Sequence, residues 1–187
     1  MKSRFVIFAA LAVFTLASCM KKEGTSTDSS TNAKADSMKA AYKAISAAWD
    51  AGNVTEFDKY ISPNSVDHDP MPGQKPGLEG MKEMAKMMKA SYPDMKSTID
   101  YIGVDGDILT ARFHMAGTNS GPMMGMPPTG KKVNVEGVDM VKWENGKFTE
   151  HWGVFDAMGM MQQLGMAPMP GAPPAGDMGK PMDKKKM

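Results

Sequence analysis

The sequence predicts an α+β fold, in which helices occupy the first half of one domain and antiparallel strands occupy the second half. In the first half, apolar residues recur at intervals of three and four, as on a helix that buries one face. The first such stripe consists of Met38, Tyr42, Ile45 and Trp49. In the second half, apolar and polar residues alternate with the period of a strand. We therefore expect a curved antiparallel sheet with the helices on its concave side.

The helical half is divided by residues that begin or end helices. Asp36 or Ser37 is suited to cap the first helix, and Gly52-Asn53 interrupts its apolar stripe. The expected elements that follow are a short helix over 54–61, an extended piece over 65–69 and a longer helix over 78–92. Pro93 ends the last of these, since proline cannot continue a helix.

The second half is expected to contain four strands and a closing helix. The strands are predicted over 98–104, 108–117, 131–143 and 147–155. Asn145-Gly146 separates the last two, and this pair favours a type I′ hairpin turn because both central residues need positive φ. A short helix over 157–164 follows, with Gly165 as its C-cap residue.

The N-terminal residues resemble a bacterial export signal. Residues 1–18 combine a basic start, a short apolar run and small residues, which is typical of a signal peptide. The last of them and Cys19, the only cysteine, resemble a lipobox. We therefore expect a lipid on Cys19 that anchors the protein in the membrane of the cell envelope. A chance cysteine after an ordinary signal is the alternative. Met20 after Cys19, in place of aspartate, resembles a sorting signal for the outer membrane of Gram-negative bacteria.

Two segments flank the predicted domain, which spans 36–165. Residues 19–35 are almost entirely small or polar, so we expect a flexible tether. Residues 166–187 are rich in Pro, Gly, Met and Lys, so we expect a disordered tail. The net charge of +1 gives no reason to expect nucleic acid as a partner.

Several motifs follow one another across the domain. They are Val66-Asp67-His68-Asp69-Pro70, Gly117-Thr118-Asn119-Ser120-Gly121-Pro122, Gly125-Met126-Pro127-Pro128-Thr129-Gly130-Lys131 and Glu150-His151-Trp152-Gly153-Val154-Phe155-Asp156. In order and spacing they resemble the SnoaL-like polyketide (ester) cyclases of the nuclear-transport-factor-two-like superfamily. The resemblance implies a cone-shaped sheet around the N-terminal helices, an enclosed cavity, and proton-transfer chemistry without a cofactor. Homodimers that pair through the open sheet face are common in this superfamily, so a homodimer is one expectation.

Asp156 is the first candidate catalytic residue. The resemblance makes Asp156 the general acid/base, and strand alternation places Trp152 and Val154 on its face, so we expect Trp152 to line the cavity. The alternative is that Asp156 caps the helix over 157–164, because aspartate is a favoured N-cap residue. The two roles are compatible.

Asp139 is a second candidate, because it is an acidic residue in an otherwise apolar strand. The resemblance favours a place in the cavity, where Asp139 would hold polar groups of the substrate. Trp143 shares its face and is expected to line the same cavity. Arg112 is a candidate substrate-binding residue or a buried ion-pair partner for Asp139, while an exposed edge charge is the alternative for Asp139.

Histidines supply the remaining candidates. The resemblance places His68 near the cavity, as a candidate catalytic residue that orients a substrate oxygen; a solvent-exposed turn is the alternative. His151 is a candidate substrate-binding residue, although it faces away from Asp156 unless a bulge at Gly153 changes the parity. The spacing of the histidines does not fit a zinc site, so we expect no metal.

Methionine is unusually frequent, with 22 residues in 187. Thioethers are soft ligands that select Cu(I), but methionine also fills cores and lines pockets as leucine does. Most domain methionines occupy positions that are apolar in the family, so we interpret them as buried core and pocket lining. Weak Cu(I) binding is expected mainly in the tail, residues 166–187.

Three functions follow from these observations. The first is an enzyme that acts by acid/base chemistry on a small apolar carbonyl compound, without a cofactor. The second is a lipoprotein that binds a small apolar ligand in the same cavity without turnover. The third is a methionine-rich protein that handles copper.

Overall fold

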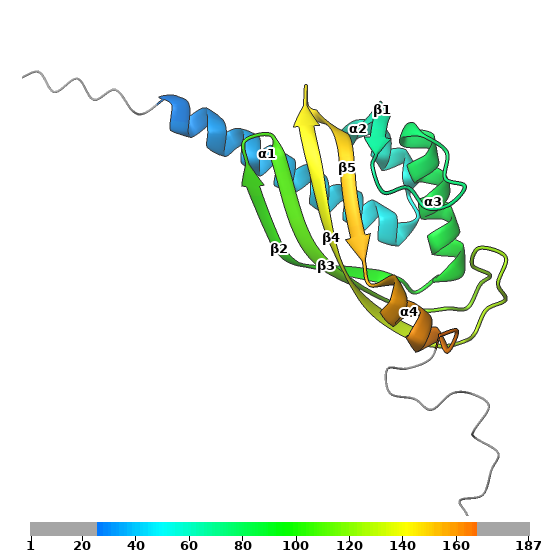
Figure 1. Ribbon diagram of the computed structural model, residues 1–187. Helices are drawn as coiled ribbons and strands as arrows, with labels where there is room; N and C mark the ends of the chain where they lie inside the picture. The colour runs from blue at the N-terminus through cyan, green and yellow to red at the C-terminus, as the bar shows by residue number, and fades with distance from the viewer. Residues whose placement is uncertain (1–25, 168–187) are drawn as a thin grey trace, which may run out of the picture.

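The computed structural model describes residues 26–167, which form a curved, unclosed five-stranded sheet and four α-helices (Figure 1). The strands are β1 (Ile61–Asp67), β2 (Lys96–Asp105), β3 (Ile108–Thr118), β4 (Lys132–Glu144) and β5 (Lys147–Phe155). Their order in the sheet is β1-β5-β4-β3-β2. This arrangement confirms the α+β class.

The helices are α1 (Ser26–Ala51), α2 (Phe57–Tyr60), α3 (Gly77–Ser91) and α4 (Ala157–Leu164), with a short 3-10 turn at Val54–Glu56. Helix α1 begins at Ser26, so residues 26–35 are helical and do not form the expected tether. Two contacts support this early part of the helix. Ser37 Oγ donates to Ala33 O at 2.9 Å, and Lys34 forms an ion pair with Asp107 in the β2–β3 turn.

The sheet pairing agrees with the prediction except at one edge. Strands β2, β3, β4 and β5 pair antiparallel in sequence order. The β4–β5 turn has φ of 51° at Asn145 and 81° at Gly146, as a type I′ turn requires. Strand β1 instead pairs with β5 in parallel, so the sheet is mixed rather than wholly antiparallel. The residues that follow β1 therefore reach the end of β5 that carries the candidate site.

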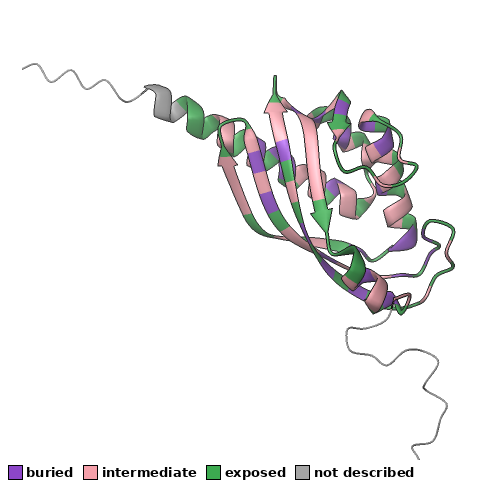
Figure 2. Ribbon diagram, viewed as in Figure 1, coloured by how far each residue is buried: buried purple, intermediate pink, exposed green. Residues whose placement is uncertain are grey.

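The buried core lies between the sheet and the helices, and purple bands mark it on the strands and helices (Figure 2). One cluster packs α1 against the sheet and includes Met38, Tyr42 and Phe148, which confirms the predicted stripe on α1. A second cluster, around Phe57, joins α1, α2 and α3. A third surrounds Tyr92 beneath α4 and contains several methionines. Within residues 26–167, no helix is long and apolar enough to cross a membrane.

Candidate active site

The inner face of β5 carries His151, Gly153 and Phe155. In the β4–β5 pairing, Val141 lies opposite His151 and Asp139 lies opposite Gly153. Because directly paired residues project to the same side, the inward-facing residues of β4 determine which residues of β5 face inward. The prediction that Trp152 and Asp156 line the cavity is therefore wrong, whereas Val154 does line it. The cause is one extra residue in β5, which shifts the pairing register between β4 and β5.

One extra residue changes the parity of β5. Trp143 pairs with Phe148, and the next residue along β4, Lys142, pairs with Glu150, so Thr149 is left as a bulge. Phe148 and His151 consequently both face inward, although simple alternation would place them on opposite sides. No bulge occurs at Gly153, so His151 stays on the face opposite Trp152 and Val154, as strand alternation predicted.

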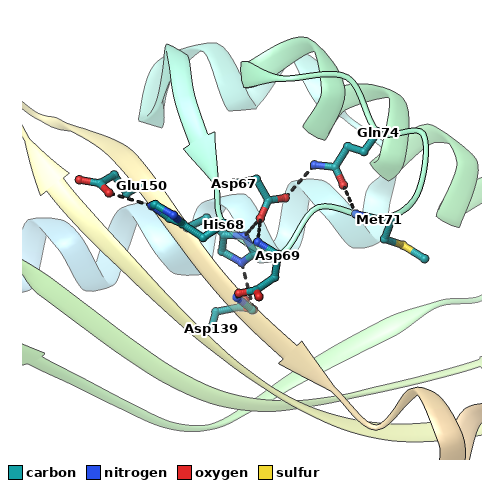
Figure 3. A network of polar contacts seen from close by, with 9 residues as sticks. Asp67, His68, Asp69, Met71, Gln74, Asp139 and Glu150 are labelled. Atoms are coloured by element: carbon teal, nitrogen blue, oxygen red, sulfur yellow. Dashed lines mark hydrogen bonds and ion pairs between the residues drawn. The ribbon is translucent and has the colours of Figure 1, made fainter.

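His151 is held between the carboxylates of Asp67 and Asp139, both of which are labelled in Figure 3. Its Nδ1 lies 3.0 Å from Asp67 Oδ1, and its Nε2 lies 3.3 Å from Asp139 Oδ1. Asp139 Oδ2 accepts a hydrogen bond of 2.7 Å from the hydroxyl of Tyr42 on α1. Gln74 Nε2 donates to Asp67 Oδ2 at 2.7 Å. Residues from α1, β1, β4, β5 and the loop before α3 thus meet at this histidine.

The charges in this network follow from burial and pairing. Burial by itself lowers the pKa of the His151 imidazole, but the hydrogen bonds and charges of Asp139 and Asp67 outweigh it and raise the pKa to about 9. Burial, together with the charge and hydrogen bond of Asp139, raises the pKa of the Tyr42 phenol well above its ordinary value. At neutral pH, His151 is therefore an imidazolium and Tyr42 is a neutral donor.

The segment Asp67-His68-Asp69 lies on both faces of β5. Asp67 reaches inward to His151. His68 lies on the outer face, where its ring stacks on Trp152 at 4.4 Å between centroids and its Nε2 contacts Glu150 at 2.9 Å. Asp69 Oδ2 accepts from the backbone N–H of Gly153 at 3.2 Å. His68 and Trp152 are therefore outside the cavity, and their predicted roles inside it are wrong.

Gly153 leaves the space that the His151 ring occupies. A Cβ at position 153 would lie 2.7 Å from His151 Cε1 and 2.9 Å from His151 Nε2. Such contacts are shorter than van der Waals separation, so any larger residue would displace the imidazole. The glycine therefore allows His151 and Asp139 to lie close together on neighbouring strands.

These residues form one wall of a cavity of about 460 Å³. Eleven of its 32 lining residues are methionine. They are Met71, Met81, Met84, Met87, Met88, Met115, Met123, Met124, Met126, Met160 and Met161. This confirms the interpretation of domain methionines as pocket lining. Met124 departs from the expected burial, since it is 46% exposed.

Comparison with known proteins identifies the family of the chain. The family model described as SnoaL-like polyketide cyclase matches residues 39–164. The chain belongs to this family. Aklanonic acid methyl ester cyclase DauD from Streptomyces sp. (strain C5) is 26% identical over 117 residues, covering 60% of this chain and 70% of the relative. Nogalonic acid methyl ester cyclase from Streptomyces nogalater is 23% identical over 125 residues, covering 63% and 90%.

Solved structures of similar proteins share the fold. TsrD from Streptomyces laurentii has a TM-score of 0.66 at 29% identity, covering 71% of this chain and 97% of that one. Wild-type IdmH from Streptomyces antibioticus has a TM-score of 0.60 at 29% identity, covering 68% and 98%. The SnoaL-like fold of this chain is therefore supported by sequence and by structure.

Three other predicted site residues lie elsewhere in this SnoaL-like domain. Asp156 is exposed and caps α4, since its Oδ1 accepts from Gly159 N at 2.8 Å, and it does not line the cavity. Trp143 packs edge-on against Phe148 in the core, at 4.8 Å between ring centroids. Arg112 is on the outer sheet face, paired with Asp100 and Glu136. The hypothesis of a buried ion pair between Arg112 and Asp139 is therefore wrong.

The structure retains Asp139 and His151 from the predicted set and adds Tyr42 and Asp67. The sequence pattern assigned Tyr42 only to the core face of α1, because its spacing fits an apolar stripe. Asp67 stood in a motif without a role, although strand alternation already separates it from His68. Among residues 26–167, no group of three or more His, Cys, Asp or Glu side chains is arranged to hold a metal ion. Cys19 lies outside the described residues.

Proposed function

We propose that the protein is a cofactor-independent acid/base enzyme that cyclises a small apolar carbonyl compound in the methionine-lined cavity, with Asp139 as the general base. The observation that carries this proposal is the contact between His151 Nε2 and Asp139 Oδ1, which at 3.3 Å is the longest in the network. A long hydrogen bond is readily exchanged for a bond to substrate. Methyl ester cyclases among the relatives support the reaction class.

The proposed reaction moves one proton away from carbon and returns it to oxygen. Asp139 removes a proton from the carbon next to a carbonyl, and the carbonyl oxygen, now an enolate, accepts a hydrogen bond from the His151 imidazolium. The enolate carbon then forms a bond to a second carbonyl carbon of the same molecule. The resulting alkoxide takes the proton from Asp139. Product and substrate are isomers, so no external reactant is consumed.

The remaining polar residues prepare the pair for this step. Asp67 fixes the imidazolium through Nδ1, so that Nε2–H points toward Asp139. Tyr42, which stays protonated, fixes the orientation of the Asp139 carboxylate through its second oxygen. The walls of the cavity are largely apolar, which strengthens the electrostatic interactions at the reacting atoms.

The test is proton exchange at carbon. The purified protein is incubated in D₂O, without added metal or cofactor, with aklanonic acid methyl ester and with a series of smaller 1,5-diketones, and NMR follows the hydrogens next to the carbonyls. We expect protein-dependent deuterium incorporation and, for true substrates, a cyclised isomer of the same elemental composition. Tight binding without exchange between pH 6 and 9 would instead favour the ligand-binding lipoprotein.

We also propose that a lipid on Cys19 anchors the protein in the bacterial cell envelope, on the evidence of the lipobox-like residues that precede it. Replacement of Cys19 by Ala should release the protein from the membrane fraction or leave it unprocessed, with the domain still folded. Fractionation of cells and mass spectrometry of the N-terminal peptide measure both outcomes. Recovery of wild-type protein with a free Cys19 thiol would contradict the proposal.

A further inference from the structure

Three methionines converge at the end of the cavity beneath α4. Met123 and Met126 form an isolated antiparallel bridge. The distance is 3.0 Å from Met123 N to Met126 O and 2.9 Å from Met126 N to Met123 O. Directly paired residues of an antiparallel bridge project to the same side, so the two thioether side chains lie next to each other. Met160 of α4 belongs to the same core cluster as Met123, and Met126 packs against that cluster.

The hydroxyl of Tyr92 shows where the sulfur lone pairs point. It lies 3.6 Å from Met123 Sδ and 4.0 Å from Met160 Sδ, and the Tyr92 side chain is fully buried. Two thioether sulfurs therefore face a single point inside the protein. Thioethers are weak hydrogen-bond acceptors, so little stabilisation is lost if these lone pairs turn to a stronger partner.

The charge of the cavity favours a cation as that partner. Carboxylates of Asp67, Asp69 and Asp139 line it, and no lysine or arginine does so among the described residues; Glu150 also borders it but is paired with Lys142 and His68 on the outer face. His151 supplies one positive charge against the three negative ones of Asp67, Asp69 and Asp139. A hard divalent ion would need three convergent oxygen or nitrogen ligands, and the described residues lack such a group. Thioether sulfur instead selects soft Cu(I).

We propose that Met123, Met126 and Met160 bind one Cu(I) ion through their sulfur atoms, at the end of the cavity next to Tyr92. The ion reaches the site past the exposed Met124-Gly125 turn that joins Met123 to Met126. The ion stays Cu(I) throughout, and no electron transfer is involved. This site is separate from the Asp139–His151 pair and does not depend on the proposed cyclase chemistry. It also differs from the expectation that copper binding belongs mainly to the tail.

The test uses the full mature chain, since the tail contains further methionines: Met166, which packs against the core cluster, and Met169, Met178, Met182 and Met187. The protein carries ¹³C in its methionine methyl groups and is titrated anaerobically with Cu(I), and separately with the air-stable soft ion Ag(I), against a competing chelator. We expect the methyl signals of Met123, Met126 and Met160 to shift together and to saturate at one equivalent.

Three variants assign the site. Because outer-shell changes alone cost metal sites about 10–100-fold in affinity, replacing all three ligands by Leu should weaken the tight site by at least about 100-fold. The control Met158→Leu is on the same helix as Met160, but Met158 is 63% exposed and does not line the cavity, so affinity should not change. Replacing Met169, Met178, Met182 and Met187 by Leu should remove only weaker Cu(I) sites.

Two outcomes would overturn the proposal. One is that the tightly bound equivalent of Cu(I) remains in the triple variant and is lost when Met169, Met178, Met182 and Met187 are replaced. The other is that saturating Ag(I) leaves the signals of Met123, Met126 and Met160 unmoved. Met→Leu changes conserve volume and usually cost less than about 1.5 kcal/mol, and the single variants Met123→Leu and Met160→Leu test the site if the triple variant does not fold.

Discussion

The free energy of unfolding should fall by about 3 kcal/mol as the pH rises from about 6.5 to beyond about 9, because the folded protein raises the pKa of His151. The native state binds more protons than the unfolded state between these two pKa values. The contribution of His151 is therefore fully present below pH 6.5 and is lost as the pH rises through 9. Its side chain is only 23% exposed, so solvent screens little of this effect.

The groups that face His151 separate this transition from others. Asp67 lies against Nδ1 and Asp139 against Nε2, while Tyr42 acts through Asp139. Burial raises the pKa of Asp67, but hydrogen bonds from His151, Gln74 and the Asp69 N–H together lower it, so its contribution is lost at acidic pH rather than alkaline pH. The alkaline loss of stability therefore belongs to His151.

Urea unfolding at pH 6 to 9.5 measures this prediction, with His151→Gln as the matched control. The variant should be less stable at pH 6, since two carboxylates lose their shared cation, but its stability should depend much less on pH. NMR titration of the imidazole provides a direct readout. A wild-type profile as flat as that of the variant would contradict the prediction.

Features determined by nearby residues were predictable from the sequence. The Asn145-Gly146 turn and the helix end at Gly165 each need positive φ, and the structure has values of 51°, 81° and 74° at these residues. The apolar spacing of α1 likewise located Met38 and Tyr42 in the core. Asp156 caps α4, as one of its two predicted roles required. Such signals depend on short segments that carry their own geometry.

The candidate site could not be predicted in full, because it depends on pairing between distant strands. The bulge at Thr149 decides which side of β5 faces the cavity, and no local pattern marks it. The parallel pairing of β1 with β5 brings Asp67 beside His151, which is 84 residues away in sequence. Tyr42 is used twice, as part of the core and as a donor to Asp139. A periodic pattern reports only the first of these uses.

Asp139→Asn should reduce turnover of a cyclised substrate by about 10²–10⁴-fold, the usual contribution of general acid/base catalysis, with KM little changed. Asparagine keeps the size of the side chain and an oxygen that accepts from Tyr42, but it cannot take a proton from carbon. The matched control is Asp156→Asn, which keeps the N-cap of α4 and should leave both turnover and stability unchanged. The opposite result, an active Asp139→Asn and an inactive Asp156→Asn, would return the catalytic role to Asp156.

The same substitution has a second readout that a merely structural residue would not give. Burial lowers the pKa of His151, two carboxylates raise it, and the hydrogen bond to Asp139 is the largest cause of the rise. Asp139→Asn should therefore lower the pKa of His151 and shrink the loss of stability at alkaline pH. If turnover fell while the imidazole titrated as in the wild-type protein, the contact between Asp139 and His151 would not exist in solution, and the proposed pair would be wrong.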